Sequence, residues 1–116
     1  MIKKVEKEMN GMLERSEKIW DSLQRGLTRI EDECGEIWWH GEEVCERLGF
    51  SDPNEGLDSV EFYCKKRHSM SSDEPSVIFI NDLGFADLSL VSEIPECREL
   101  DKISEEIRLG LQSQDH

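Results

Sequence analysis

Two histidines and two cysteines near the middle of the chain are the residues whose types and spacing are best suited to chemistry. His40, Cys45, Cys64 and His68 follow one another with four, eighteen and three residues between them. Two thiolates and two imidazoles make a complete tetrahedral ligand set for zinc. Cys64 and His68 are four residues apart, so both would face one ion if they lay on a helix. A small zinc-binding regulatory protein is therefore one hypothesis for the function.

The order of these ligands resembles the HCCH zinc motif of lentiviral Vif proteins over residues 40–68, with a first interval shorter by one residue. The resemblance implies a zinc ion held by the four side chains. The alternative is that Cys45 and Cys64, like Cys34 and Cys97, are reduced thiols that pack as small apolar side chains. The sequence contains no phosphate-binding glycine loop and no nucleophile elbow. We therefore expect no enzyme, and no cofactor unless zinc is bound.

Acidic side chains dominate the composition. The 116 residues include 27 acidic and 14 basic side chains, which gives a formal net charge of −13. Residues 31–61 hold eleven acidic side chains against Arg47 alone, and a basic cluster follows at Lys65, Lys66 and Arg67. Nucleic-acid phosphates would be repelled by most of such a surface, so we expect no direct nucleic-acid binding. A basic protein partner is the charge-complementary expectation, and solubility is the alternative explanation for the charge.

The acidic segment is also where we expect the partner to bind. Trp39 falls outside the apolar seam described below, so it is a candidate for a contact with a partner or for a second layer of the core. In composition the chain resembles small acidic phage proteins that block DNA-binding enzymes, which implies a nucleic-acid-mimicking inhibitor as a further alternative. The predicted partner-contact residues are Glu31, Asp32, Glu33, Glu36, Trp39, Glu42 and Glu43.

The first 48 residues follow a heptad pattern. With Leu13 at position a, eleven of the fourteen a and d positions between residues 2 and 48 are apolar. A repeat of 3.5 residues is typical of a helix that buries one seam against another helix. We therefore expect a mainly α fold with a long N-terminal coiled-coil or helical-hairpin helix, and a homo-oligomer. The predicted oligomer interface consists of Leu13, Trp20, Leu23, Leu27, Ile30 and Ile37.

These patterns divide the chain into two expected regions. Residues 1–50 are predicted to be a helical or coiled-coil segment, with one helix over about 2–34 and a second segment to 48. Whether this helix continues or breaks near Gly35 and Gly41 stays open, because each glycine weakens a helix by about 1 kcal/mol. Residues 51–116 are predicted to be a small helical region with at most one or two short strands and a flexible loop near 69–75.

Local signals place the elements of the second region. Gly49 is a helix stop, and Asp52 followed by Pro53 predicts a new helix that runs to about residue 68. Residues 76–80 predict a short strand, and with the serines and acids before them they also resemble a SUMO-interacting motif. Gly84 argues against a stable helix over residues 81–90. A last amphipathic helix starts at residue 95, with an apolar face of Cys97, Leu100, Ile103, Ile107 and Leu111.

The cellular location follows from what the sequence lacks. It has no run of eighteen apolar residues, and charges near the N-terminus interrupt the apolar stretch that a signal peptide needs. We expect an intracellular, cytoplasmic protein. The preferred functional hypothesis is a non-enzymatic protein–protein interaction module, an oligomeric adaptor or inhibitor that docks on a basic partner.

Overall fold

A computed structural model describes the backbone of residues 2–113 and the side chains of residues 10–110. The chain forms two compact units. The first, here called the helical unit, combines the residues before Gly26 with those from Ile94 onward. The second, here called the sheet unit, is Gly26–Glu93. No helix within residues 2–113 combines the length and the apolar character needed to cross a membrane.

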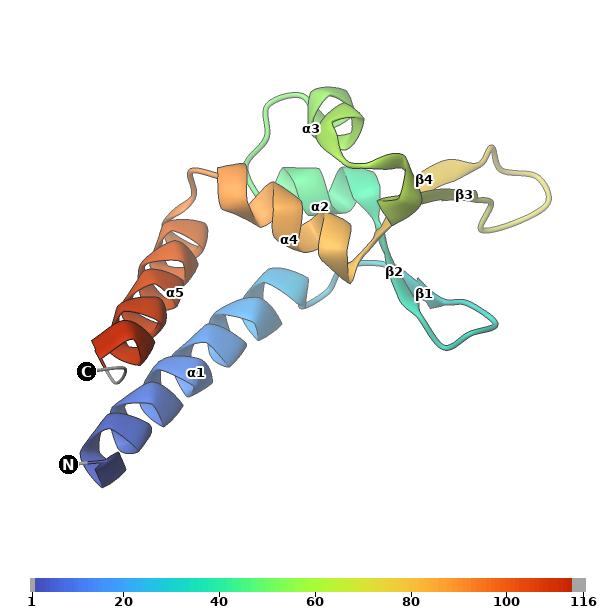
Figure 1. The fold of residues 1–116 in the computed structure, drawn as a ribbon. Helices are drawn as coiled ribbons and strands as arrows, with labels where there is room; N and C mark the ends of the chain where they lie inside the picture. Colours follow the sequence, from blue (N-terminus) through green and yellow to red (C-terminus); the bar gives the residue numbers. More distant parts are fainter. Residues whose placement is uncertain (1, 114–116) are drawn as a thin grey trace. The chain divides into compact units, whose positions relative to one another are not determined.

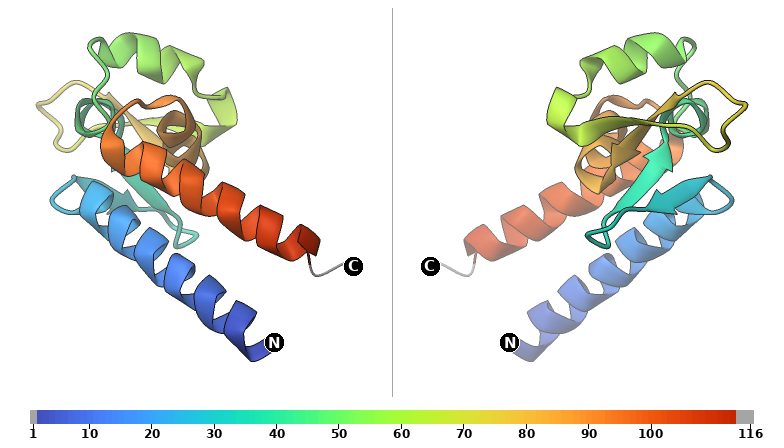
Figure 2. Two further views of the ribbon diagram at one scale, coloured as in Figure 1. Left: turned by 90° about the vertical axis from the view of Figure 1, so that its left-hand side faces the viewer. Right: turned by 90° about the vertical axis from the view of Figure 1, so that its right-hand side faces the viewer.

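The helical unit is an antiparallel pair of helices, α1 (Ile2–Gln24) and α5 (Pro95–Ser113). Figure 1 shows the start of α1 and the end of α5 at the same end of the pair, and Figure 2 shows them side by side. An ion pair joins Arg15 to Glu99. The predicted C-terminal helix is confirmed: Cys97, Leu100 and Ile103 are buried and Ile107 is half-buried, whereas the side chain of Leu111 lies outside the described residues.

The predicted long N-terminal helix is wrong, because α1 ends at Gln24. Gly26 has a φ of +80°, a left-handed conformation that glycine adopts readily and that ends the helix. The chain then forms β1 (Arg29–Glu31) and β2 (Ile37–His40). The apolar heptad positions at Ile30 and Ile37 therefore lie in strands, where β-branched residues are also favoured. The fold is mixed α/β with an antiparallel sheet, and neither mainly α nor a coiled coil.

The sheet has four strands in the order β1–β2–β4–β3, and all neighbours are antiparallel. The two remaining strands are β3 (Lys65–His68) and β4 (Val77–Asn81). The strand predicted at residues 76–80 is thus confirmed within one residue. Strand β4 pairs with β2 on one side and with β3 on the other, so its backbone is not available to extend a partner's sheet as a SUMO-interacting motif would.

Short helices complete the sheet unit. They are α2 (Gly41–Arg47), α3 (Pro53–Ser59), the 3₁₀ turn η1 (Phe62–Cys64) and α4 (Asp82–Val91). The predicted stop at Gly49 is confirmed: its φ is +82°, and the Phe50 amide donates to the Cys45 carbonyl at 3.0 Å, as in a Schellman ending. The predicted start is confirmed too, with the Asp52 side chain accepting from the Asn54 amide.

Two other predictions in this region are wrong. The helix expected to reach residue 68 ends at Ser59 and is followed by η1 and β3. The segment after β4 is helical despite Gly84, because the Asn81 side chain caps α4 by accepting from the Gly84 amide at 2.9 Å. A Cβ on Gly84 would lie 3.3 Å from the Cβ atoms of both Cys64 and Ile80, so glycine allows α4 to approach the sheet closely.

One face of the sheet, here called the covered face, packs against helices. The ring of Trp39 meets Phe85 of α4 edge to face at 5.8 Å between centroids, and its indole N–H donates to Asp82 at 2.8 Å. Ile80 is opposite Trp39 in the register and is fully buried. Leu57 of α3 approaches Gly41 at the end of β2. Helix α4 and the segment from α3 to η1 therefore cover this face with apolar side chains.

Candidate binding surface on the outer sheet face

The opposite face of the sheet, here called the outer face, carries a row of aromatic and basic side chains. His40, Phe79 and Lys66 are direct neighbours across β2, β4 and β3. Because side chains alternate along a strand, Trp38 and His68 point to the same side as this row. Three of these five residues carry a ring and a polar atom or a charge, so the face combines apolar area with hydrogen-bonding groups.

The side chains of the outer face cover one another. The Lys66 ammonium lies 5.0 Å from the centroid of the Trp38 ring, which requires the side chain to cross strand β4. The rings of His40 and His68 meet Phe79 edge to face, with centroids at 5.5 Å and 5.8 Å. Phe79 is fully buried. Polar side chains, two histidines and a lysine, therefore contact the aromatic residues of this face.

The loop between β1 and β2 is fixed to the outer face through Asp32. Its carboxylate accepts from the amides of Cys34 and Glu36 and from the indole N–H of Trp38, each at 2.9 Å. The indole hydrogen bond is the largest cause that holds the pKa of Asp32 below its ordinary value, and the amide bonds act in the same direction. An ionised Asp32 thus sets both the loop conformation and the orientation of the Trp38 ring.

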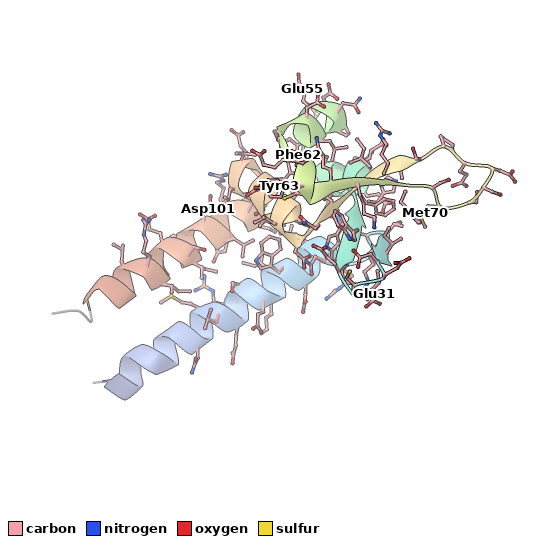
Figure 3. All side chains as sticks on the ribbon, turned by 45° about the vertical axis from the view of Figure 1, so that its right-hand side comes forward. Glu31, Glu55, Phe62, Tyr63, Met70 and Asp101 are labelled. Carbon is pink, nitrogen blue, oxygen red and sulfur yellow. The ribbon has the colours of Figure 1, made fainter. Side chains whose placement is uncertain are left out.

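A cavity of about 680 Å³ lies between this loop and strand β3. Its loop side is acidic and its β3 side is basic, and it is lined by Ile30, Glu31, Asp32, Glu33, Cys34, Lys66 and His68. The mixed charge means that a bound group can meet carboxylates on one side and a cation on the other. Figure 3 labels Glu31, the last residue of β1, and Met70, in the loop that follows β3.

Strand β3 is an edge strand that carries the basic cluster. Its four side chains are not equally available, because the Lys65 ammonium donates to the Leu57 carbonyl at 3.0 Å. Lys66 is half-buried, whereas Arg67 and His68 are exposed. The cluster therefore offers a ligand two or three positive groups along one edge of the sheet.

The structure does not bring the four predicted zinc ligands together. His40 and His68 lie on the outer face, whereas Cys64 lies beneath Gly84 on the covered face. The prediction assumed that Cys64 and His68 share a helix face, but the chain between them is a strand, which separates the two side chains. Among residues 10–110, no three His, Cys, Asp or Glu side chains are grouped to hold a metal ion.

The local environment of each predicted ligand is structural. The His40 Nδ1 accepts from the Glu43 amide and so caps α2. Cys45 and Cys64 are fully buried, and burial raises the pKa of the Cys45 thiol to about 11 and that of Cys64 in the same direction. Both cysteines are thus neutral thiols in apolar surroundings, as the alternative interpretation expected.

The residues predicted to contact a partner are dispersed over three elements. Glu31, Asp32, Glu33 and Glu36 belong to β1 and the following loop, and Glu42 and Glu43 begin α2. The Glu43 carboxylate accepts from the Thr28 amide at 2.9 Å. Trp39 is only 5% exposed, because it packs on the covered face. A partner role for the acidic residues stays a prediction.

The residues predicted to form an oligomer interface do not lie on one helix. Leu13, Trp20 and Leu23 belong to α1, where Leu13 is half exposed, Trp20 half-buried and Leu23 buried. Ile30 and Ile37 lie in β1 and β2, and Leu27 precedes β1; all three are half-buried. A single helical seam through the six residues is thus absent, and the oligomeric state stays a prediction.

Sequence reasoning missed two parts of the surface. It did not assign Lys66 and Phe79 to one face, because residues 65–68 are four consecutive basic-type side chains and show no period-two alternation that would indicate a strand. It also missed the exposed aromatic pair Phe62 and Tyr63, because a helix was predicted to run through these residues to about residue 68 and the structure has the turn η1 there.

Comparison with known proteins assigns the chain to a family. Residues 27–108, well over half of the chain, match the model described as the BRO family, N-terminal domain, abbreviated Bro-N. The chain therefore belongs to the BRO family, and the match includes almost the whole sheet unit and most of α5. Comparison with curated proteins and with solved structures gave no significant match.

Proposed function

We propose that this chain is a non-enzymatic regulatory protein and that DNA is the ligand of its Bro-N domain. The observation that carries the proposal is the family match over residues 27–108, because Bro-N is a domain of the DNA-binding type. The outer face supports a binding role, because it carries aromatic and basic side chains and a cavity opens beside it. This proposal replaces the expectation from charge alone that the chain avoids nucleic acid.

The charge of the sheet unit restricts how DNA would bind. The unit holds sixteen acidic and five basic side chains, a formal net charge of −11. Within the sheet unit, only strand β3 carries adjacent cationic side chains, namely Lys65, Lys66 and Arg67, and the Lys65 ammonium is already bound to the Leu57 carbonyl. DNA would therefore contact this edge and the neighbouring outer face, with few phosphates neutralised. The affinity of such a complex would come in part from contacts other than phosphate contacts, and it would still weaken as salt rises.

Fluorescence anisotropy with a labelled duplex of mixed sequence tests the proposal. The logarithm of the affinity should fall with the logarithm of the salt concentration, with a slope of about 0.9 for each phosphate contact. Lys66→Gln combined with Arg67→Gln should lower the slope by about 2 on the same scale. Lys102→Gln, an exposed lysine on α5, is the matched control and should leave the slope unchanged. Absence of binding by the wild type at low salt would refute the proposal.

The net charge favours a second candidate, a protein–protein interaction module. An adaptor or inhibitor that docks on a basic partner would use the acidic surface directly, and one form of it would occupy the DNA-binding surface of another protein. Homo-oligomerisation fits the same candidate and is tested by light scattering. Binding of a basic protein by a chain that does not bind DNA would favour this second candidate over the first.

A further inference from the structure

An exposed aromatic pair stands apart from both faces of the sheet. Phe62 is 82% exposed and Tyr63 is 59% exposed, and their rings meet edge to face with centroids 5.8 Å apart. Both belong to η1, and Figure 3 labels them next to each other beside α4. Large aromatic side chains are usually at least partly buried, so two adjacent exposed rings are typical of a contact surface.

The position of the aromatic pair is set by the packing of the turn η1 against helix α4. Cys64, the last residue of η1, is fully buried, and its amide donates to the Glu61 carbonyl at 2.9 Å. A Cβ on Gly84 of α4 would lie 3.1 Å from Val60 and 3.3 Å from Cys64, so the turn is packed tightly against α4. The core beneath is filled by Val60 and Cys64, which leaves no space for Phe62 to turn inward.

Helix α4 carries another exposed apolar side chain. Leu83, the second residue of α4, is 53% exposed and directly precedes the glycine that contacts η1. We call Phe62 and Tyr63 the aromatic patch. Each large aromatic ring can bury between about 150 and 250 Å² in a contact, so the two rings suffice for the apolar centre of a small interface.

The surroundings of the aromatic patch are negatively charged. Glu61 directly precedes the pair and Asp87 lies one helical turn beyond Leu83, and both are exposed. Both lie close enough to Cys64 that their charges add to the effect of burial in raising the pKa of its thiol. The nearest cation along the chain, Lys65, is held by the Leu57 carbonyl. The rim around the apolar centre is therefore acidic.

We propose that the aromatic patch, with Glu61 and Asp87 at its rim, is the docking site for a positively charged protein segment with an apolar centre. This rests on the second candidate function and assigns it a place on the molecule. An apolar centre of aromatic anchors supplies most of the affinity at such interfaces, whereas a charged rim supplies orientation and speed of association.

The test uses the whole chain and two synthetic peptides. One is a labelled amphipathic helix of lysine and leucine, and the other carries the same lysines with glutamine in place of leucine. Anisotropy should show tighter binding of the first peptide. The double variant Phe62→Ala with Tyr63→Ala should weaken that binding by about tenfold, as expected when central aromatic anchors are removed. Met70→Ala is the matched control, since Met70 is half exposed in the loop before β4.

A second double variant tests the contribution of the acidic rim separately from that of the aromatic rings. Glu61→Gln with Asp87→Asn should weaken binding of the lysine–leucine peptide at low salt and have little effect at high salt, because screening removes the contribution of exposed charges. Circular dichroism and tryptophan fluorescence of each variant should match the wild type, since the altered side chains are exposed.

The results of these experiments test the proposed docking site and the second candidate function separately. Equal affinity of the wild type and of the Phe62→Ala, Tyr63→Ala variant for the peptide would overturn the site and leave the second candidate function standing. No binding of either peptide would overturn both. A dimeric wild type that becomes monomeric in the same variant would show a second copy of the chain on the patch, which also overturns the proposal. DNA affinity should be unchanged in this variant, because the patch does not include β3.

Discussion

The two faces of the sheet are buried in different ways. On the covered face, Trp39 and Ile80 are buried by apolar side chains from α4 and by a close approach of backbone at Gly84. On the outer face, Trp38 and Phe79 are nearly as inaccessible, yet a lysine and two histidines cover them. Equal burial therefore has different meanings: the covered face is a core, and the outer face is a surface with a fixed arrangement of polar groups.

The difference indicates where function can be located. A side chain on the covered face cannot change its contacts without moving a helix. On the outer face, Lys66 could leave the Trp38 ring, and His68 could leave the Phe79 ring, to contact a ligand instead. The outer face can thus bind without unfolding any element.

Removing a ring from the covered face should have the largest effect on stability. Phe85→Ala should lower the free energy of unfolding by about 3–5 kcal/mol, because the side chain is fully buried against Trp39 and its loss leaves a cavity. Urea denaturation followed by tryptophan fluorescence measures this change. Phe62→Ala, on the exposed aromatic patch, is the control and should change the value by less than about 0.5 kcal/mol. Equal losses would mean that Phe62 is part of the core.

In the second half of the fold, the elements with local signals could be predicted. The helix stop at Gly49, the start at Asp52 and Pro53, the strand predicted at residues 76–80 and helix α5 each depend on a few adjacent residues, whereas the end of α3 at Ser59 and the helix α4 did not follow from such signals. The N-terminal region could not be predicted in the same way. A heptad pattern and a pair of short strands both place apolar residues at Leu27, Ile30 and Ile37, and only the partner strand β4, forty residues later, decides between them.

Adding a side chain at Gly41, where the backbone is closely packed at the border of the covered face, should have the next largest effect on stability. A Cβ on Gly41 would lie 2.6 Å from Leu57 and 2.8 Å from the backbone carbonyl oxygen of Ile78. Gly41→Ala should therefore lower the free energy of unfolding by about 1–3 kcal/mol, since a backbone atom cannot move aside easily. Gly110→Ala, where the added Cβ meets nothing within 4 Å, is the control. A stability of Gly41→Ala equal to that of the wild type would contradict the packing at this border.

The candidate site was the least predictable part of the molecule. Its residues come from four strands, and the contact between Lys66 and Trp38 depends on the strand order β2–β4–β3, which no local signal reveals. The zinc hypothesis failed for the same reason. It placed Cys64 and His68 on one helix, but in the structure Cys64 ends the turn η1 against α4 and His68 lies at the end of strand β3. The basic cluster itself could be recognised in the sequence. The hydrogen bond from the Lys65 ammonium to the Leu57 carbonyl could not be predicted from it.

The contact that covers the outer face should have a smaller energetic effect. Lys66→Met keeps most of the apolar stem but removes the charge above the Trp38 ring, and should lower the free energy of unfolding by about 0.5–1 kcal/mol. The emission maximum of tryptophan should shift as well, because the charge lies close to the indole. Arg67→Met, which changes the adjacent exposed residue on the same strand, should do neither. A result in which both variants behave alike would show that the ammonium does not interact with the ring.

The smallest expected effect concerns the charge of Asp32, which orients Trp38 from the loop side of the outer face. The pKa of this carboxyl is lowered in the folded chain, chiefly by the Trp38 indole hydrogen bond. Its contribution to stability is therefore present above the ordinary Asp pKa of about 3.8 and is lost as the pH falls through the lower folded value. The difference in unfolding free energy between the wild type and Asp32→Asn should accordingly shrink on acidification through this range. Glu33→Gln, in the same loop, is the control, and a difference that stays constant from neutral to acidic pH would show that the hydrogen-bond geometry, and not the charge, holds the loop.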